Sequence, residues 1–297
     1  MLVEAVGLGV LFLLAFGNGA NDAGKSIAPL MIDPGGTGWR PSRRALIWGG
    51  LFTGLGSVSA ILISTRLLSV FTPENLLQTT PGSAFILAAL IGAALWVVAA
   101  TLLRLPVSTT HAILGAVLLQ AVYLYGTSNL DWALLTWRIL LPLVAGPFAA
   151  LLGVAILDRL IRRRRAKQDD GSGRVGKAQW ASSAATAYAR GVNDAPKMVA
   201  LGVFFVLTTP VETFSYLVVA VAVVMGSLVW GDRVAKTVLG RTQSMEQGQK
   251  VKAGIATAAL LSAGAYFGDA FSATQVSESA AAGGRGSGWW GSPRTCR

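Results

Sequence analysis

Two short polar segments of similar sequence interrupt an otherwise apolar chain. Residues 19–25 read GANDAGK and residues 191–197 read GVNDAPK, so five of seven positions agree. A carboxylate within the apolar part of a membrane is costly unless it is paired or solvated, so Asp22 and Asp194 are candidate site residues. They could hold a cation, Na⁺ or H⁺. They could also accept hydrogen bonds from a protonated oxyanion.

A lysine lies three residues after each of these aspartates. Lys25 and Lys197 would lie on roughly the same helical face as Asp22 and Asp194. They would pair with the aspartates or contact a bound anion directly, and the residue pattern leaves both alternatives open. A purely structural ion pair is a third interpretation.

Hydroxyl side chains form a second polar group in each half of the chain. Residues 106–111 read PVSTTH and open an apolar run that continues to Tyr125, so Ser108, Thr109 and Thr110 would lie at a helix start. There, hydroxyls and free backbone N–H groups are suited to bind a tetrahedral oxyanion. Ser272 and Thr274 are the weaker counterparts in the second half. The structural alternative is that these hydroxyls bond back to their own helices.

The elements that must position these residues are membrane-spanning helices. The chain is 53% hydrophobic and only 13% charged, with a mean hydropathy of +0.57, whereas a soluble domain carries about 25% charged residues. Apolar runs of about 20 residues predict spanning helices, because backbone groups must pair internally within a bilayer. The expected fold class is therefore all-α, a polytopic membrane protein. The predicted spans are 2–17, 43–65, 83–103, 107–125, 134–157, 178–208, 214–230 and 251–268.

Loop charges predict how these spans are oriented. The basic loops 33–44, 158–177 and 231–252 are expected on the cytoplasmic side of the cell membrane, with the N-terminus outside. The two Asn-Asp segments would then cross in opposite directions, which predicts inverted-topology repeats. Glycine and proline around each aspartate predict broken helices at both segments. The expected organisation is a first transmembrane repeat (1–157), a basic cytoplasmic loop (158–177) and a second, inverted repeat (178–275).

Composition also argues against several functions and partners. The net charge of +11 lies in loops between apolar spans, so membrane lipid rather than nucleic acid is the expected partner. No cofactor is expected. Cys296 is the single cysteine and His111 the single histidine, so the sequence offers no metal-ligand cluster or nucleophile–base pair for an enzyme. The only metal expected is Na⁺ at Asp22 and Asp194.

The two polar motifs resemble the signatures of the PiT family of inorganic phosphate transporters, in the family's order, and the resemblance covers roughly residues 1–275. It implies inverted repeats that hold phosphate between them and cotransport it with Na⁺ or H⁺. By position it implies that Asn21, Asp22, Asn193 and Asp194 are substrate and cation residues. It implies that Ser108, Thr109 and Thr110 are phosphate donors, with Ser272 and Thr274 as their counterparts. The chain departs from the family at Lys25 and Lys197, where a fixed positive charge could replace a bound cation.

The residues after 275 also depart from the family. Segment 276–297 is rich in small residues, and we expect it to be a disordered tail that leaves the second repeat incomplete at its C-terminus. A truncated or frame-shifted sequence is one hypothesis for this tail. If the tail is native, a homodimer or another partner would be needed to complete the transport path.

The function predicted from these features is secondary active transport of inorganic phosphate by cation symport and alternating access. Two alternatives remain open. A permease for sulfate or another oxyanion is one, because hydroxyls and helix N-termini discriminate poorly among tetrahedral anions. A passive anion channel is the other, although repeated aspartates are unusual in a simple anion pore.

Overall fold

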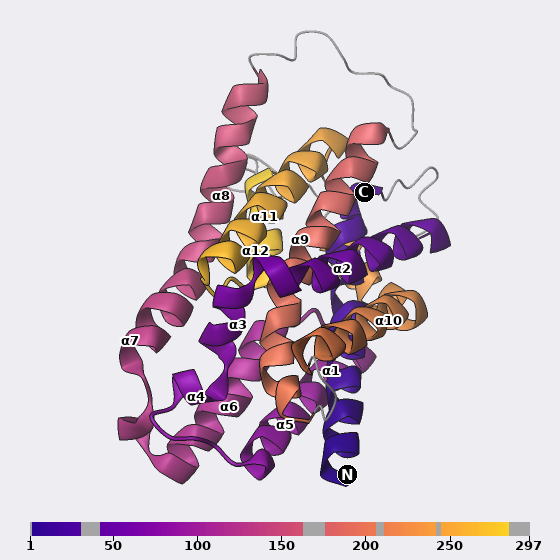
Figure 1. The fold of residues 1–297 in the computed structure, drawn as a ribbon. Coiled ribbons are helices and arrows are strands. Elements are labelled where there is room, and N and C mark those ends of the chain that lie inside the picture. The colour runs from indigo at the N-terminus through magenta and orange to yellow at the C-terminus, as the bar shows by residue number, and fades with distance from the viewer. Residues whose placement is uncertain (1, 31–41, 163–175, 206–210, 242–244, 285–297) are drawn as a thin grey trace.

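The computed structural model describes residues 2–30, 42–162, 176–205, 211–241 and 245–284, which form a helical bundle without β-strands in those ranges (Figure 1). The polytopic all-α prediction is confirmed. Within the part of the chain that the structure describes, five helical stretches are long and apolar enough to cross a membrane, and Thr109–Tyr125 is a shorter apolar helix. The α-helices are α1 (Leu2–Ile27), α2 (Arg43–Ile63), α3 (Thr65–Phe71), α4 (Pro73–Leu76), α5 (Ser83–Leu102), α6 (Thr109–Tyr125), α7 (Trp132–Leu134), α8 (Leu141–Arg162), α9 (Lys177–Gly202), α10 (Val211–Arg241), α11 (Gln247–Phe267) and α12 (Ala273–Gly284). Four short 3₁₀ or π segments complete the described helices: Ala28–Leu30, Thr127–Asn129, Leu135–Leu140 and Val203–Phe205.

The two halves of the chain interlock through long helices. α1 packs against α10, and α9 packs against α2, so the first helix of each half contacts the second helix of the other half. In Figure 1, α1 rises from the N-terminus at the bottom while α9 descends from the top. The opposite directions of these two helices agree with the inverted repeat predicted from the sequence.

Glycines make this interlocking possible. A Cβ atom on Gly19 would clash with the Val223 carbonyl, and one on Gly191 would clash with the Thr53 carbonyl. These two positions are equivalent in the two halves. Small residues allow helix backbones to approach closely where no hydrophobic effect drives association within the membrane.

The site is shaped by two helical hairpins. The side-chain amide of Gln120, late in α6, donates to the carbonyl of Phe85, early in α5, so α5 and α6 run antiparallel. Their connection, residues 103–108, forms the first tip. α11 and α12 form the second hairpin, whose tip is residues 268–272. Each tip turns through a left-handed residue, Arg104 with φ 61° and Gly268 with φ 82°. The α5–α6 hairpin lies in the lower half of Figure 1 and the α11–α12 hairpin in the upper half.

The helix interruptions therefore lie elsewhere than the sequence predicted. α1 runs unbroken through Asp22, and α9 runs unbroken through Asp194 and Pro196. The glycines around the aspartates serve helix packing instead of helix breaks, because the neighbouring backbones fill the space that their side chains would occupy. The chain leaves helical geometry at the two hairpin tips, and these tips supply the irregular backbone at the site.

Other boundaries also differ from the sequence-based prediction. Residues 276–284, predicted to be disordered, belong to α12, whose buried residues Val276 and Ala280 pack toward α8 and α11. Alanine-rich sequence favours a helix, and this tertiary packing stabilises it. Much of the predicted 231–252 loop is helical, because α10 continues to Arg241 and α11 begins at Gln247. Residues 163–175 of the predicted 158–177 loop, 33–41 of the 33–44 loop, and 285–297 of the tail lie outside the described residues.

Candidate functional site

The two hairpin tips meet at a pair of serines. Ser108 Oγ accepts a hydrogen bond from the backbone N–H of His111, which caps the N-terminus of α6. Ser272 Oγ accepts from the backbone N–H of Gln275 at the start of α12. The two hydroxyls lie 2.9 Å apart, although 164 residues separate them in the chain. Two helix N-termini, each carrying a partial positive charge, therefore converge on one point between the halves.

Asn21 fixes the first tip against α1. Its side-chain oxygen accepts from the backbone N–H of Val107 at 3.0 Å, and its amide nitrogen donates to the Leu105 carbonyl at 2.9 Å and to Thr101 at 3.1 Å. One turn earlier, the amide of Asn18 donates to the hydroxyl of Thr109 at 2.9 Å. Side chains of α1 thus satisfy part of the irregular backbone at the tip.

Asn193 has the corresponding place in the second half. Its amide nitrogen donates to the carbonyl of Phe271 in the second tip at 3.3 Å and to Asp194 Oδ1 at 2.8 Å. Its side-chain oxygen is buried and has no hydrogen-bond partner among the described residues. Asn193 therefore makes fewer hydrogen bonds to its tip than Asn21 makes to the first.

Asp22 lies between two buried cations. Lys25 Nζ donates to Asp22 Oδ1, and the Nη2 atom of Arg190 lies 3.1 Å from Asp22 Oδ2. Nη1 of Arg190 also donates to the backbone carbonyl of Asp22 at 2.8 Å. The side chains of Asp22 and Arg190 are only 2% and 1% exposed. The ion pair joins α1 of the first half directly to α9 of the second.

Among the described residues, Asp194 has a single cationic partner. Lys197 Nζ lies 3.4 Å from Asp194 Oδ1, one turn along α9. The other carboxylate oxygen, Asp194 Oδ2, is buried and has no hydrogen-bond partner among the described residues. This oxygen is an acceptor that a ligand carrying a proton could use.

Among the fully buried side chains at the tips, cations outnumber carboxylates. Three buried cations, Lys25, Arg190 and Lys197, accompany two buried carboxylates, Asp22 and Asp194. Buried ion pairs balance part of this charge and leave one cation in excess. Together with the two converging helix N-termini, this excess favours an anionic ligand.

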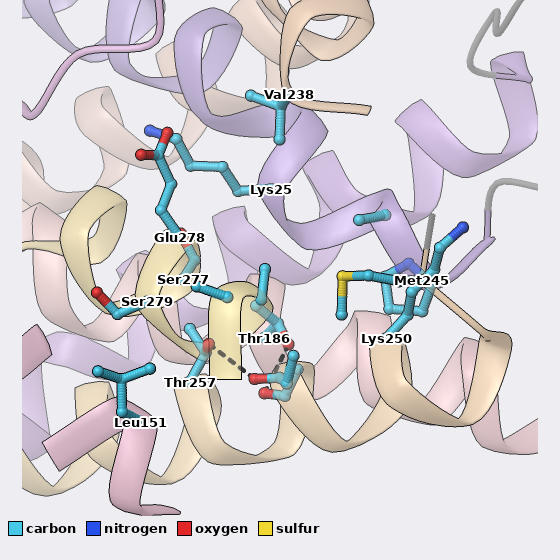
Figure 2. A pocket seen from close by; sticks show the side chains of 16 residues that line it. Lys25, Leu151, Thr186, Val238, Met245, Lys250, Thr257, Ser277, Glu278 and Ser279 are labelled. Atoms are coloured by element: carbon cyan, nitrogen blue, oxygen red, sulfur yellow. Dashed lines mark hydrogen bonds between the residues drawn. The ribbon is translucent and has the colours of Figure 1, made fainter. Parts of the chain in front are cut away.

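A pocket leads from one end of the bundle to Lys25. It has a volume of about 430 Å³, within the usual range of small-molecule sites, and is lined by residues of α1, α8, α9, α10, α11 and α12. Figure 2 shows Lys25 and Glu278 extending toward one end of the pocket and Lys250 toward the other. Thr186 and Thr257 line its floor and bond to helix backbone carbonyls. Lys197 is not among its lining residues.

The structure brings together every residue that the sequence selected. The first-half set is Asn21, Asp22, Lys25, Ser108, Thr109 and Thr110; the second-half set is Asn193, Asp194, Lys197, Ser272 and Thr274. Two residues were missed. Arg190 and Asn18 each precede the glycine of an Asn-Asp segment, at equivalent positions of the repeat. A charged residue at such a position in an apolar span was the signal that could have identified Arg190.

Comparison with known proteins places this site in a family. The sequence profile described as the phosphate transporter family matches residues 18–175 and 168–289. The chain belongs to the phosphate transporter family. Each of the two matched stretches contains one Asn-Asp segment and one hairpin tip. The resemblance noted from the sequence motifs is thereby confirmed, and the helices long enough to cross a membrane identify an integral membrane protein.

Individual members of the phosphate transporter family match at moderate identity. A Pyrococcus furiosus protein named as a phosphate permease is 31% identical over 160 residues, 52% of this chain and 38% of that protein. A Mycobacterium bovis protein named as a low-affinity inorganic phosphate transporter is 25% identical over 278 residues, 88% of this chain and 63% of that protein. The chain thus spans less than two thirds of the length of either relative.

A solved structure shares the fold. The structure described as the sodium-dependent phosphate transporter superimposes with a TM-score of 0.81 at 17% identity, covering 97% of this chain and 90% of that one. At this identity the match establishes the arrangement of the helices alone. The chemistry of the site has to be argued from the residues of this chain.

Proposed function

We propose that this chain is a transporter of inorganic phosphate that binds the anion between the two hairpin tips. The observation that carries the proposal is the contact of Ser108 with Ser272, where two helix N-termini from opposite halves meet. Lys25 and Lys197 flank that contact from α1 and α9. Family membership supports phosphate as the anion. A tetrahedral oxyanion would take hydrogen bonds from the serine hydroxyls and from the free N–H groups of both helices, and the lysines would supply positive charge beside it.

The inverted arrangement supports transport by alternating access. The site lies where the halves meet, and the ion pair between Arg190 and Asp22 crosses that boundary. Rocking one half against the other would open the tips to one side of the membrane and then to the other. The pocket that reaches Lys25 would be the path on one side. A coupled cation, H⁺ or Na⁺, would supply the driving force for accumulation.

A buried hydrogen-bond acceptor without a partner favours the binding of phosphate over sulfate. Asp194 Oδ2 is buried without a partner among the described residues and can accept a hydrogen bond. Phosphate carries at least one proton at neutral pH, whereas sulfate carries none. A site that contains a buried acceptor rejects a ligand unable to donate to it, because the acceptor would stay unpaired.

The experiment is uptake of radiolabelled phosphate into proteoliposomes under imposed Na⁺ or H⁺ gradients. We expect gradient-driven accumulation by the native chain, with strong loss in the Asp22→Asn and Asp194→Asn variants. Glu74→Gln removes an exposed carboxylate of α4, which belongs to neither tip and to neither Asn-Asp segment, and is the matched control. Well-folded protein that equilibrates phosphate without accumulating it would indicate a passive channel. Accumulation that is insensitive to both Asp substitutions would contradict the assigned site.

A further inference from the structure

Lys25 ends in a small cage of oxygen atoms. Its ammonium group contacts the carboxylate of Asp22, the hydroxyl of Thr274 at 2.6 Å and the backbone carbonyl of Val107 at 3.4 Å. The carboxylate lies one turn earlier on α1, while the hydroxyl belongs to α12 of the other half. The carbonyl belongs to the first hairpin tip. An ammonium has three N–H donors and no acceptor, so these three oxygens use its full donor capacity.

Lys197 ends in a cage of the same composition. Its ammonium lies 3.4 Å from the carboxylate of Asp194, 2.9 Å from the hydroxyl of Thr110 and 2.7 Å from the backbone carbonyl of Phe271. The hydroxyl again comes from the opposite half, and the carbonyl again comes from a hairpin tip. Thr110 and Phe271 are the repeat equivalents of Thr274 and Val107, at the offset of 164 residues that separates Ser108 from Ser272. The two cages are therefore related by the internal symmetry of the fold.

This ligand set suits a small hard cation as well as an ammonium group. Carboxylate, hydroxyl and backbone carbonyl oxygens are the ligands that such ions take in proteins, and transporters bind Na⁺ through irregular backbone of this kind. Each cage already contains one positive charge, and its lysine is buried, with Lys25 6% and Lys197 1% exposed. A second cation among the same oxygens would meet strong repulsion at short range. Na⁺ and the lysine ammonium therefore exclude each other.

We infer that Lys25 and Lys197 are tethered cations that occupy two symmetry-related cation sites, so that this chain works without Na⁺. A tethered cation supplies the positive charge beside a bound anion but does not cross the membrane. A Na⁺ gradient therefore cannot drive transport through binding at these two positions. The inference concerns the cation requirement of the site and rests on the proposed phosphate transport only for its consequence in uptake.

The first test measures Na⁺ binding without requiring transport. Thermal unfolding of the purified full chain is followed in NaCl and in choline chloride at equal ionic strength. In Lys25→Asn and Lys197→Asn, a short polar side chain leaves the cage open, and we expect a saturable rise in Tm that is specific to Na⁺. Lys25→Met and Lys197→Met remove the same charge but fill the cage with an apolar chain, so they are the matched controls. We expect no Na⁺-specific rise in the Met variants or in the native chain.

Two results would overturn the inference. One is a saturable Na⁺-specific rise in Tm for the native chain, because that requires an open Na⁺ site beside the lysines. The other is the absence of any difference between the Asn and Met variants at both positions. Since the readout is stability, either result can be obtained even if the chain moves no phosphate.

The second test is phosphate uptake with Na⁺ replaced by choline. Uptake by the native chain should be the same in Na⁺ and in choline. The Asn variants should take up about 10-fold more phosphate in Na⁺ than in choline when Na⁺ is present at about ten times its dissociation constant. Loss of native uptake on replacing Na⁺ would refute the tethered-cation inference while upholding phosphate transport. Absence of uptake in every ionic condition, with the Tm pattern as expected, would refute the transport proposal and leave the cation sites established.

Discussion

At the scale of single residues, the two halves differ most at Arg190. This guanidinium occupies the position equivalent to Asn18 and gives Asp22 a second cationic partner, whereas Asp194 has only Lys197. Asp22 therefore has both carboxylate oxygens engaged, and Asp194 has one oxygen free of partners among the described residues. Equivalent positions thus have different tasks. Asp22 joins the two halves, and the proposed role of Asp194 is to offer an acceptor to the ligand.

Arg190→Gln should destabilise the chain and abolish uptake. Lys25 still balances the charge of Asp22, but Asp22 Oδ2 and the Asp22 backbone carbonyl lose their buried partner, which costs about 1–3 kcal/mol for each acceptor left unpaired. Chemical unfolding in detergent measures the stability, and proteoliposome uptake measures the activity. Adding Asp22→Asn to this variant should cost less than the sum of the two single losses, because the pair between Arg190 and Asp22 is lost only once. If the double variant loses as much free energy of unfolding as the two single variants lose together, the ion pair contributes little to stability.

Asp194→Asn should weaken the preference for phosphate over sulfate. The loss of one hydrogen bond to a charged acceptor, about 1.5–3 kcal/mol, predicts a fall in the ratio of affinities of about 10-fold or more. Equilibrium binding of phosphate to purified protein, with sulfate as competitor, gives this ratio without requiring transport. Asp22→Asn is the comparison, since its oxygens already have partners, and it should change the ratio less. An unchanged ratio in Asp194→Asn would remove the basis for phosphate selectivity at this oxygen.

At the scale of elements, glycine positions set how closely α1 and α9 approach their partners. Gly19 and Gly191 face the backbones of α10 and α2. From the sequence alone, a glycine beside an intramembrane aspartate is equally compatible with a helix break and with close helix packing. The partner backbone decides between the two, and it belongs to a segment far away in the chain. The position of the helix interruptions could not be predicted for that reason.

Gly19→Ala should therefore be strongly destabilising. The added methyl group would clash with the backbone of α10 at Val223, which cannot move aside as a side chain can. Overpacking of this kind costs roughly 1–3 kcal/mol, and more where backbone is involved. Gly9→Ala, on the same helix with open space around its Cβ position, is the control and should be neutral or slightly stabilising. Thermal unfolding of both variants in the same detergent checks this prediction, and equal Tm values for the two would contradict it.

At the scale of the whole molecule, much of the site could be predicted because the chain is internally repeated. The duplicated Asn-Asp segments and the hydroxyl groups at 108–110 and 272–274 predicted which residues meet, and the structure brings them together. Arg190 was not predicted because the residue at the equivalent position of the first repeat, Asn18, is of a different type. The helical part of the tail was not predicted, because its sequence is only weakly apolar and the helix depends on packing toward α8 and α11. Features carried by both repeats were predictable, and features carried by one repeat or by distant packing were not.

The direction of the pocket is a property of the whole molecule that remains a prediction. The pocket is lined by Pro29, just before the basic segment 33–44, and by Met245, within the basic segment 231–252. If those segments are cytoplasmic, as their lysine and arginine content predicts, the pocket opens to the cytoplasm. In a Cys296→Ser background, Ala282→Cys in the pocket should then react with a membrane-impermeant maleimide only from the cytoplasmic side. Thr80→Cys, exposed on the connection between α4 and α5, should react only from outside. The opposite pattern would reverse the orientation and make this pocket the uptake side of the transport path.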